Sequence, residues 1–145
     1  MRSWWLLVVL GLCGGILAAS TPAQTPVQNS PVQAGRQFLR VLLRSDYTNA
    51  YTRLAPEIRK SVTPARFRTI ARPLVVRGQR RGTNLELYKL GARLDASGRG
   101  AGRLFVAFAW AADSASARRT PPEWLEVTFR DTASRQVLGF RLRRR

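Results

Sequence analysis

Histidine is absent from this chain of 145 residues, and cysteine occurs only once. Histidine is the side chain that most often serves as a general base and as a metal ligand. Its absence, together with the single thiol, excludes Ser-His and Cys-His catalytic pairs, zinc sites built from Cys and His, and a disulfide within the chain. We therefore expect no metal and no other cofactor. Paired carboxylates are the catalytic chemistry that remains open.

Acidic side chains are also scarce. Eight Asp and Glu stand against 25 Lys and Arg, so the formal charge is +17, and only two of the basic residues are lysines. Such a field attracts polyanions, and arginine suits bidentate contacts to phosphate. The densest basic runs supply the candidate anion-binding residues Arg80, Arg81, Arg118, Arg119, Arg143, Arg144 and Arg145. Two interpretations stay open: a surface that is basic through composition alone, and a surface that binds an anionic polymer or a lipid headgroup. No nucleic-acid motif accompanies the charge, so no specific nucleic acid is expected as the partner.

The first 20 residues have the pattern of a signal peptide. Arg2 precedes an uncharged apolar run over residues 4–19, and small residues at 18–20 suit a signal peptidase. A permanent span needs about 20 apolar residues, so we expect cleavage and no lasting transmembrane span, with an uncleaved anchor as the alternative. Cys13 follows Leu12 inside the apolar run, which fits lipidation poorly. The predicted location is the periplasm, the extracellular space or the cell surface of a bacterium.

Residues 21–33 carry three prolines and no charge, so we expect a flexible tether, which leaves residues 34–145 as one domain. Apolar residues recur with helical spacing over residues 34–44. Asp46 and Thr63 are good helix caps, and each is expected to start a further helix, with one extra turn over residues 57–62. Pro73 is expected to end the last helix, and residues 78–82 to form a basic turn.

Strand patterns fill the second half of the domain. The predicted strands are residues 85–94, with Gly91 as a candidate irregularity, 104–112, 124–130 and 137–142, separated by loops at 95–102 and 113–122 and a hairpin turn at 131–135. The second strand is almost wholly apolar, so both of its faces are covered or one packs in an oligomer. In the last strand, Leu138, Phe140 and Leu142 are expected to face inward. Helices followed by antiparallel strands predict an α+β fold with N-terminal helices packed on a curved sheet.

Several short motifs resemble one family. They are Ser45-Asp46-Tyr47, Ala50-Tyr51, Leu54, Pro56-Glu57, Thr63-Pro64 with Phe67, and Trp124-Leu125-Glu126-Val127 before the last hairpin. This pattern resembles small exported bacterial members of the nuclear-transport-factor-2-like (SnoaL-like, cystatin-like α+β) superfamily. The resemblance implies a cone-shaped domain with a pocket between helices and sheet, and a homodimer formed through the sheet. Some members are isomerases or dehydratases that use Asp and His, and others are catalytically silent; this chain has no His for that arrangement.

Aromatic and acidic side chains in the folded part give the candidate ligand pocket. Its predicted members are Tyr51, Tyr88, Trp110, Trp124 and Glu126, although such aromatics also serve as core residues. The leading interpretation is an exported, non-enzymatic binding or accessory domain. One alternative is an envelope protein recruited to anionic polymers or lipid phosphates by its arginine clusters. A second is a small-molecule isomerase or hydrolase that uses a buried carboxylate.

Overall fold

The computed structural model describes residues 30–94, 102–114 and 120–145. The predicted leader with Cys13, most of the tether, most of the loop at 95–102, and the candidates Arg118 and Arg119 lie outside the described residues. The helices are α1 (Pro31–Leu43), α2 (Tyr47–Thr52), α3 (Pro56–Ser61), α4 (Pro64–Arg81) and α5 (Ala111–Ser114), and the strands are β1 (Leu85–Arg93), β2 (Arg103–Trp110), β3 (Glu123–Phe129) and β4 (Val137–Arg144). The α5 helix replaces the expected end of the second strand.

Local side-chain caps start three of the helices. The side chain of Asp46 accepts a hydrogen bond from the Asn49 amide at 3.1 Å, and that of Thr63 accepts one from the Arg66 amide at 3.3 Å. These two predicted caps are confirmed. Ser30 caps α1 in the same way and Pro31 takes the first helical position, so the helix begins ahead of the expected start at residue 34.

The last long helix continues past its proline. Pro73 lies inside α4, which runs to Arg81 and is capped by Gly82 with a φ of 82°. The expected stop at Pro73 and the expected turn at 78–82 are therefore both wrong. Proline inside a helix costs about 3 kcal/mol. Burial of Leu74 and Val75 offsets this cost, and Gly78 lets α1 approach closely, because a Cβ there would lie 2.6 Å from Leu43 Cδ2.

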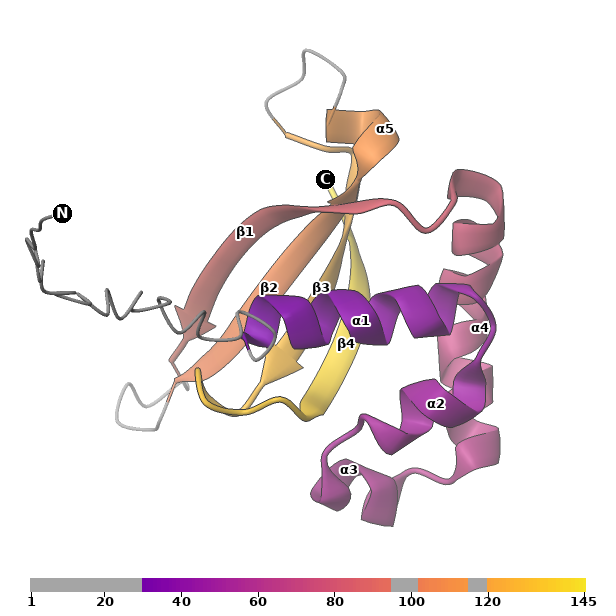
Figure 1. Cartoon of the computed structure of the whole chain (residues 1–145), viewed down its shortest axis with the longest axis vertical. Coiled ribbons are helices and arrows are strands. Elements are labelled where there is room, and N and C mark those ends of the chain that lie inside the picture. Colours follow the sequence, from indigo (N-terminus) through magenta and orange to yellow (C-terminus); the bar gives the residue numbers. More distant parts are fainter. Residues whose placement is uncertain (1–29, 95–101, 115–119) are drawn as a thin grey trace, which may run out of the picture.

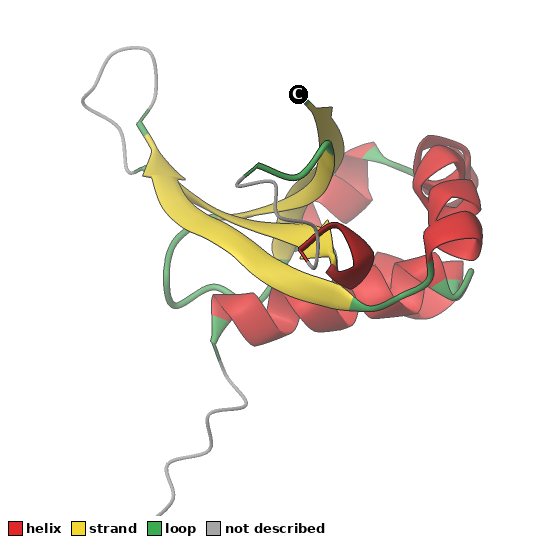
Figure 2. Ribbon diagram, turned by 90° about the horizontal axis from the view of Figure 1, so that it is seen from above, coloured by secondary structure: helices red, strands yellow, loops and turns green. Residues whose placement is uncertain are grey.

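The sheet is an antiparallel meander in the order β1-β2-β3-β4, and helices pack against it (Figure 1). The predicted α+β class is therefore confirmed. Helix α1 lies along one face of the sheet, called here the inner face (Figure 2). Register shifts occur between Leu87 and Lys89 and between Thr128 and Phe129. The irregularity expected at Gly91 is thus misplaced, and the second shift brings Val137, rather than Leu138, opposite Phe129 in the core.

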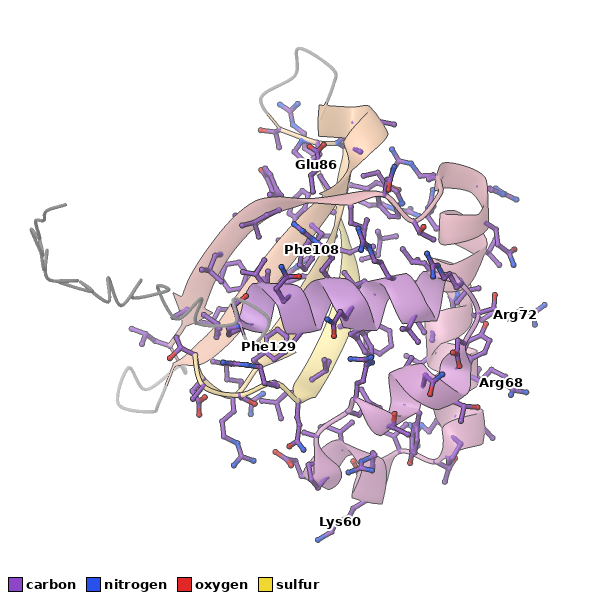
Figure 3. All side chains as sticks on the ribbon, in the orientation of Figure 1. Lys60, Arg68, Arg72, Glu86, Phe108 and Phe129 are labelled. Carbon is purple, nitrogen blue, oxygen red and sulfur yellow. The ribbon has the colours of Figure 1, made fainter. Side chains whose placement is uncertain are left out.

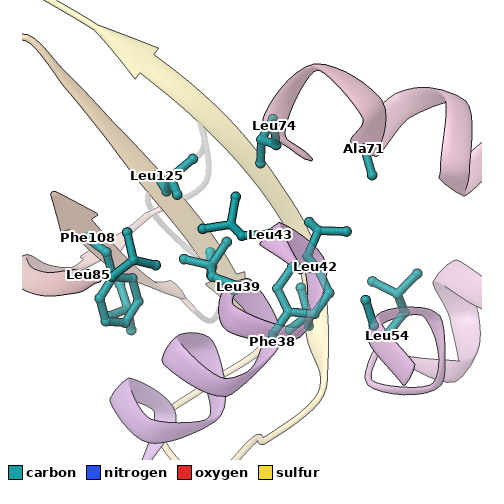
Figure 4. Close-up of a cluster of buried hydrophobic side chains, with 14 of the residues drawn as sticks. Phe38, Leu39, Leu42, Leu43, Leu54, Ala71, Leu74, Leu85, Phe108 and Leu125 are labelled. Atoms are coloured by element: carbon teal, nitrogen blue, oxygen red, sulfur yellow. The ribbon is translucent and has the colours of Figure 1, made fainter. Parts of the chain in front are cut away.

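Aromatic and aliphatic side chains fill the space between α1, α4 and the inner face (Figure 4). Phe38 and Phe67 are buried, and their rings lie 5.4 and 5.8 Å from the ring of Phe140 on β4. Each buried side chain of this size stabilises the fold by about 1.5–3 kcal/mol. On the opposite, outer face of β2, Ala107 and Ala109 are also buried. Both faces of β2 are therefore covered within one chain. This confirms the first of the two alternatives given for the second strand, namely burial of both of its faces.

Candidate functional site

The outer face of the sheet gathers charged and aromatic side chains from three strands. In β3, Leu125 and Val127 belong to the core, so the alternation of the strand turns Trp124 and Glu126 outward. Arg141 lies directly opposite Glu126 in β4, and Arg143 lies opposite Trp124. The β1 strand adds Tyr88, Lys89 and Arg93 to the same face, where they contact Trp124, Glu126 or Phe105.

Glu126 is the one buried charged residue of the described part of the chain, at 1% exposure. Its Oε1 accepts hydrogen bonds from Arg141 Nε at 2.9 Å and Nη2 at 2.7 Å, and its Oε2 accepts one from Arg93 Nη2 at 2.7 Å. Arg143 Nε lies 3.8 Å from Oε2. We call these four residues the Glu126 cluster. Three guanidinium groups surround one carboxylate, and their side chains remain 41–42% exposed, so the cluster presents excess positive charge to solvent.

Aromatic rings lie beside the cluster. The Tyr88 and Trp124 ring centroids are 5.6 Å apart, and Lys89 Nζ lies 4.6 Å from the Trp124 centroid and 5.0 Å from that of Tyr88. We call these three residues the Trp124 stack. The bulge between Leu87 and Lys89 interrupts the alternation of β1, which is how the consecutive residues Tyr88 and Lys89 both reach Trp124. The indole Nε1 of Trp124 is buried without a hydrogen-bond partner among the described residues.

Small residues beneath these side chains allow them to lie flat on the sheet. Ala107, on the central strand β2, pairs with Lys89 on one side and with Glu126 on the other. Gly91 is opposite Phe105, and a Cβ at Gly91 would lie 2.8 Å from the Phe105 ring. Arg93 in turn stacks on that ring at 4.9 Å. The outer face is therefore a layer of aromatic rings and cations that rests on Ala107, Gly91 and the ring of Phe105.

A second ion-pair network lies at the end of the sheet near α5. Glu123 forms ion pairs with Arg77, Arg81 and Arg144, with N–O distances of 3.2, 3.2 and 3.1 Å. Arg81 also pairs with Asp113. Arg81 stacks over the indole of Trp110 at 4.5 Å, while that indole donates a hydrogen bond to the Gly82 carbonyl at 3.2 Å. These contacts join the end of α4 to β2, α5, β3 and β4.

The predicted site residues fall into separate places. Tyr88, Trp124, Glu126 and Arg143 come together on the outer face. Trp110 is a core residue, and the Tyr51 hydroxyl donates hydrogen bonds to the Arg59 and Val62 carbonyls at 3.1 and 2.8 Å, which ties α2 to α3. Arg81 and Arg144 belong to the Glu123 network, whereas Arg80 and Arg145 have no carboxylate within 4.0 Å among the described residues.

Sequence reasoning missed Lys89, Arg93 and Arg141. For Arg141 a signal existed, because placing Phe140 and Leu142 inward turns Arg141 outward, to the same face as Glu126. Lys89 and Arg93 had no comparable signal, since their positions depend on the bulge in β1.

Two carboxylates on the helical side have lowered pKa values. The side-chain amide of Asn49, and then its backbone N–H, lower the pKa of Asp46. The backbone N–H of Glu57 itself, and then the Arg130 side chain, lower the pKa of Glu57. Both groups are exposed and serve a helix start or an ion pair, so neither belongs to the outer-face site.

The described ranges contain no cluster of three or more Cys, Asp and Glu side chains arranged to hold a metal ion. Within the same ranges, no helix has the length and apolar character needed to cross a membrane. Comparison of the chain with protein families, curated proteins and solved structures finds no match. The chain is therefore described by its fold and its two arginine networks, and no family is assigned to it.

Proposed function

We propose that this chain is an exported, non-enzymatic binding domain of the nuclear-transport-factor-2-like type, and that the outer face of its sheet is the binding surface. The order of four helices and then a four-stranded antiparallel sheet is consistent with that kinship. The ligand, or the part of a partner that is bound, combines a planar apolar group with a phosphate or carboxylate.

The observation that carries the proposal is the adjacency of the Glu126 cluster and the Trp124 stack. The cluster keeps an excess of guanidinium charge at half-exposed positions, which favours an anion. The stack offers ring faces against which a planar group packs, and such contacts contribute about 0.5–1.5 kcal/mol beyond the burial of area. Trp124 Nε1, buried at the same place, has no hydrogen-bond partner among the described residues.

Two features favour binding over catalysis. The space between helices and sheet, where the resemblance implies a pocket, is occupied by Phe38, Phe67 and Phe140. Glu126, the buried carboxylate that the alternative of an isomerase or hydrolase requires, uses both oxygens to accept bonds from arginines. A carboxylate held in this way acts as a counter-ion that orients guanidinium groups.

Calorimetric titration of the full chain with 1-naphthyl phosphate tests the proposal, with 1-naphthol and inorganic phosphate as half-ligands. We expect the complete probe to bind more tightly than either half. Lys89→Met with Arg143→Met should weaken its binding at least tenfold, since each charged contact contributes about 1 kcal/mol or more. The matched control is Arg59→Met with Lys60→Met, which removes the same charge from exposed positions on α3.

Equal weakening by the control pair would show that net charge alone attracts the probe. Release of 1-naphthol from the phosphate ester, lost in Glu126→Gln, would instead restore the enzyme alternative. The resemblance predicts that a second copy of this chain occupies the same face. Sedimentation velocity with and without the probe distinguishes a second copy from a ligand as the occupant. A dimer that the probe dissociates uses the same face, whereas one that the probe leaves intact does not.

A further inference from the structure

Helix α4, the longest helix among the described residues, carries arginines without a carboxylate partner in that part of the chain. Over its 18 residues α4 has six arginines and no Asp or Glu. Arg77 and Arg81 turn to Glu123 and Asp113, as described above. Arg66, Arg72 and Arg80 are exposed, and none has a carboxylate within 4.0 Å in the part of the chain that the structure describes. Arg68 and Arg72 project from α4 away from the sheet (Figure 3).

Apolar side chains lie among these arginines on the side of α4 that faces solvent. Ile70 is 49% exposed and Val76 is 39% exposed, and Pro73 is exposed between them. A groove of about 440 Å³ runs along this side of the helix and includes Arg72 and Arg80 in its walls. We call this surface the α4 solvent face, and its residues are Arg66, Thr69, Ile70, Arg72, Pro73, Val76 and Arg80.

The combination of free cations and exposed apolar groups selects a partner of matching chemistry. A soluble polyanion would use the arginines and leave Ile70 and Val76 in water. An anionic membrane surface offers phosphates to the guanidinium groups and an apolar boundary to the side chains between them, because long basic side chains reach the headgroups while their stems stay apolar. Charge on the rest of the helical layer attracts the same surface from a distance.

We propose that the α4 solvent face docks the domain onto a membrane that contains anionic phospholipids. Helix α4 lies flat on the headgroups, with Ile70, Pro73 and Val76 toward the acyl chains and the three free arginines on phosphates. The outer face of the sheet belongs to a different layer of the fold and remains available for its own ligand. This docking is independent of the function proposed for the sheet, because it shares no residue with the Glu126 cluster or the Trp124 stack.

Co-sedimentation of the full chain with vesicles tests the proposal. One set of vesicles contains 30% phosphatidylglycerol in phosphatidylcholine, and the other contains phosphatidylcholine alone. Apolar insertion by the first 20 residues contributes equally to binding of the two sets, so the difference between them measures the preference for anionic lipid. Each basic residue near an anionic surface contributes about fivefold in affinity. The triple variant Arg66→Ser, Arg72→Ser, Arg80→Ser should therefore lose about 100-fold of the preference for the anionic vesicles. The matched control removes three exposed arginines elsewhere, Arg103→Ser, Arg135→Ser and Arg145→Ser, and should retain most of that preference.

A second pair of variants separates a membrane from a soluble polyanion. Ile70→Ser with Val76→Ser should weaken binding to the anionic vesicles several-fold while leaving binding to soluble polyphosphate unchanged. In Val76→Trp, the additional tryptophan fluorescence is obtained by subtracting the spectrum of the parent chain. This fluorescence should shift to shorter wavelengths when the chain binds the anionic vesicles, and brominated lipid should quench it. Circular dichroism and thermal melts of each variant check that the fold is retained.

Three results would overturn the proposal. Equal losses in the two triple variants would mean that total charge alone draws the chain to the vesicles. Polyphosphate binding as tight as vesicle binding, insensitive to Ile70 and Val76, would identify a soluble polyanion as the occupant. Emission of Val76→Trp that stays unshifted while the chain is bound would place α4 away from the bilayer.

Discussion

The helical and sheet halves of this domain differ in how many carboxylates accompany their basic residues. Residues 30–81 contain twelve Arg and Lys but only Asp46 and Glu57 as carboxylates. The described residues from 82 onward contain nine basic residues and five carboxylates. Of those five, Asp113, Glu123 and Glu126 bind six arginines between them, two of which reach across from α4.

This difference separates arginines that hold the fold together from arginines that are free to meet a partner. A carboxylate buried among guanidinium groups fixes the positions of the strands that supply them. Exposed arginines without a partner repel one another weakly and contribute little to stability. The arginines of α4 without a carboxylate partner among the described residues therefore have the character of a recognition surface, whereas Arg81 has the character of a structural residue. The Glu126 cluster combines the two, because its arginines hold strands together and remain half-exposed.

Removing the carboxylate at the centre of the sheet should have the largest effect on stability. Glu126→Ala leaves Arg93, Arg141 and Arg143 facing one another without a counter-charge. Loss of one partner from a buried ion pair costs about 3–5 kcal/mol, and the half-exposed arginines place this change near the lower end. Urea unfolding measures it. Glu86→Ala, an exposed carboxylate on the outer side of β1 without an ion pair among the described residues, is the control and should change stability by less than about 0.5 kcal/mol. Equal effects of the two substitutions would mean that Glu126 is not the centre of the outer face.

The next largest effect concerns the packing of the same face. Gly91→Ala places a Cβ 2.8 Å from the Phe105 ring, so the ring and the Arg93 guanidinium on it must move, at a cost of about 1–3 kcal/mol. Gly139→Ala meets nothing within 4 Å, and its backbone has no positive φ. It should be neutral or stabilise by about 0.5 kcal/mol by reducing the entropy of the unfolded chain. Thermal unfolding of both variants compares them, and a neutral Gly91→Ala would show that Phe105 is loosely held.

The elements of the fold could be predicted from local signals, and two errors came from contacts distant in sequence. The caps at Asp46 and Thr63 and the alternation in β3 depend on neighbouring residues, and they were predicted correctly. The continuation of α4 past Pro73 depends on Leu43, which packs against Gly78 from another helix. The core position of Val137 depends on a register shift relative to Phe129. A local sequence pattern shows neither the contact of Leu43 with Gly78 nor the pairing of Val137 with Phe129.

The candidate site could be predicted only in part, for a related reason. Trp124 and Glu126 were found because they alternate with core residues in one strand. Their partners Lys89 and Arg93 come from a strand on the far side of β2, and the bulge in β1 sets which residues face outward there. A prediction of the whole site therefore requires the strand order and the register together.

Acidification should reveal how much the exposed ion pair between Glu57 and Arg130 contributes to stability. Glu57 at the start of α3 pairs with Arg130, and its pKa lies below the ordinary value of 4.5. A lowered pKa means stability that is present above pH 4.5 and is lost as the pH falls through the folded-state value. Melting temperatures from pH 6 to pH 3 should therefore fall more steeply for the parent chain than for Glu57→Gln. Parallel curves would show that this pair contributes nothing to folding, as is common for exposed pairs.

The smallest expected effect is a gain in stability within the helical half. Arg66 occupies the third position of α4, close to the Thr63 cap, where a positive charge opposes the helix dipole. Arg66→Glu should remove that repulsion and complete a capping box with Thr63, for a gain of about 0.5 kcal/mol in urea unfolding. The uncharged variant Arg66→Gln should gain less, and salt should reduce the difference between the two. The same Arg66→Glu chain should bind anionic vesicles more weakly than Arg66→Gln. A residue whose replacement strengthens the fold and weakens the docking is placed for recognition, whereas a loss of stability in Arg66→Glu would make Arg66 a structural residue like Arg81.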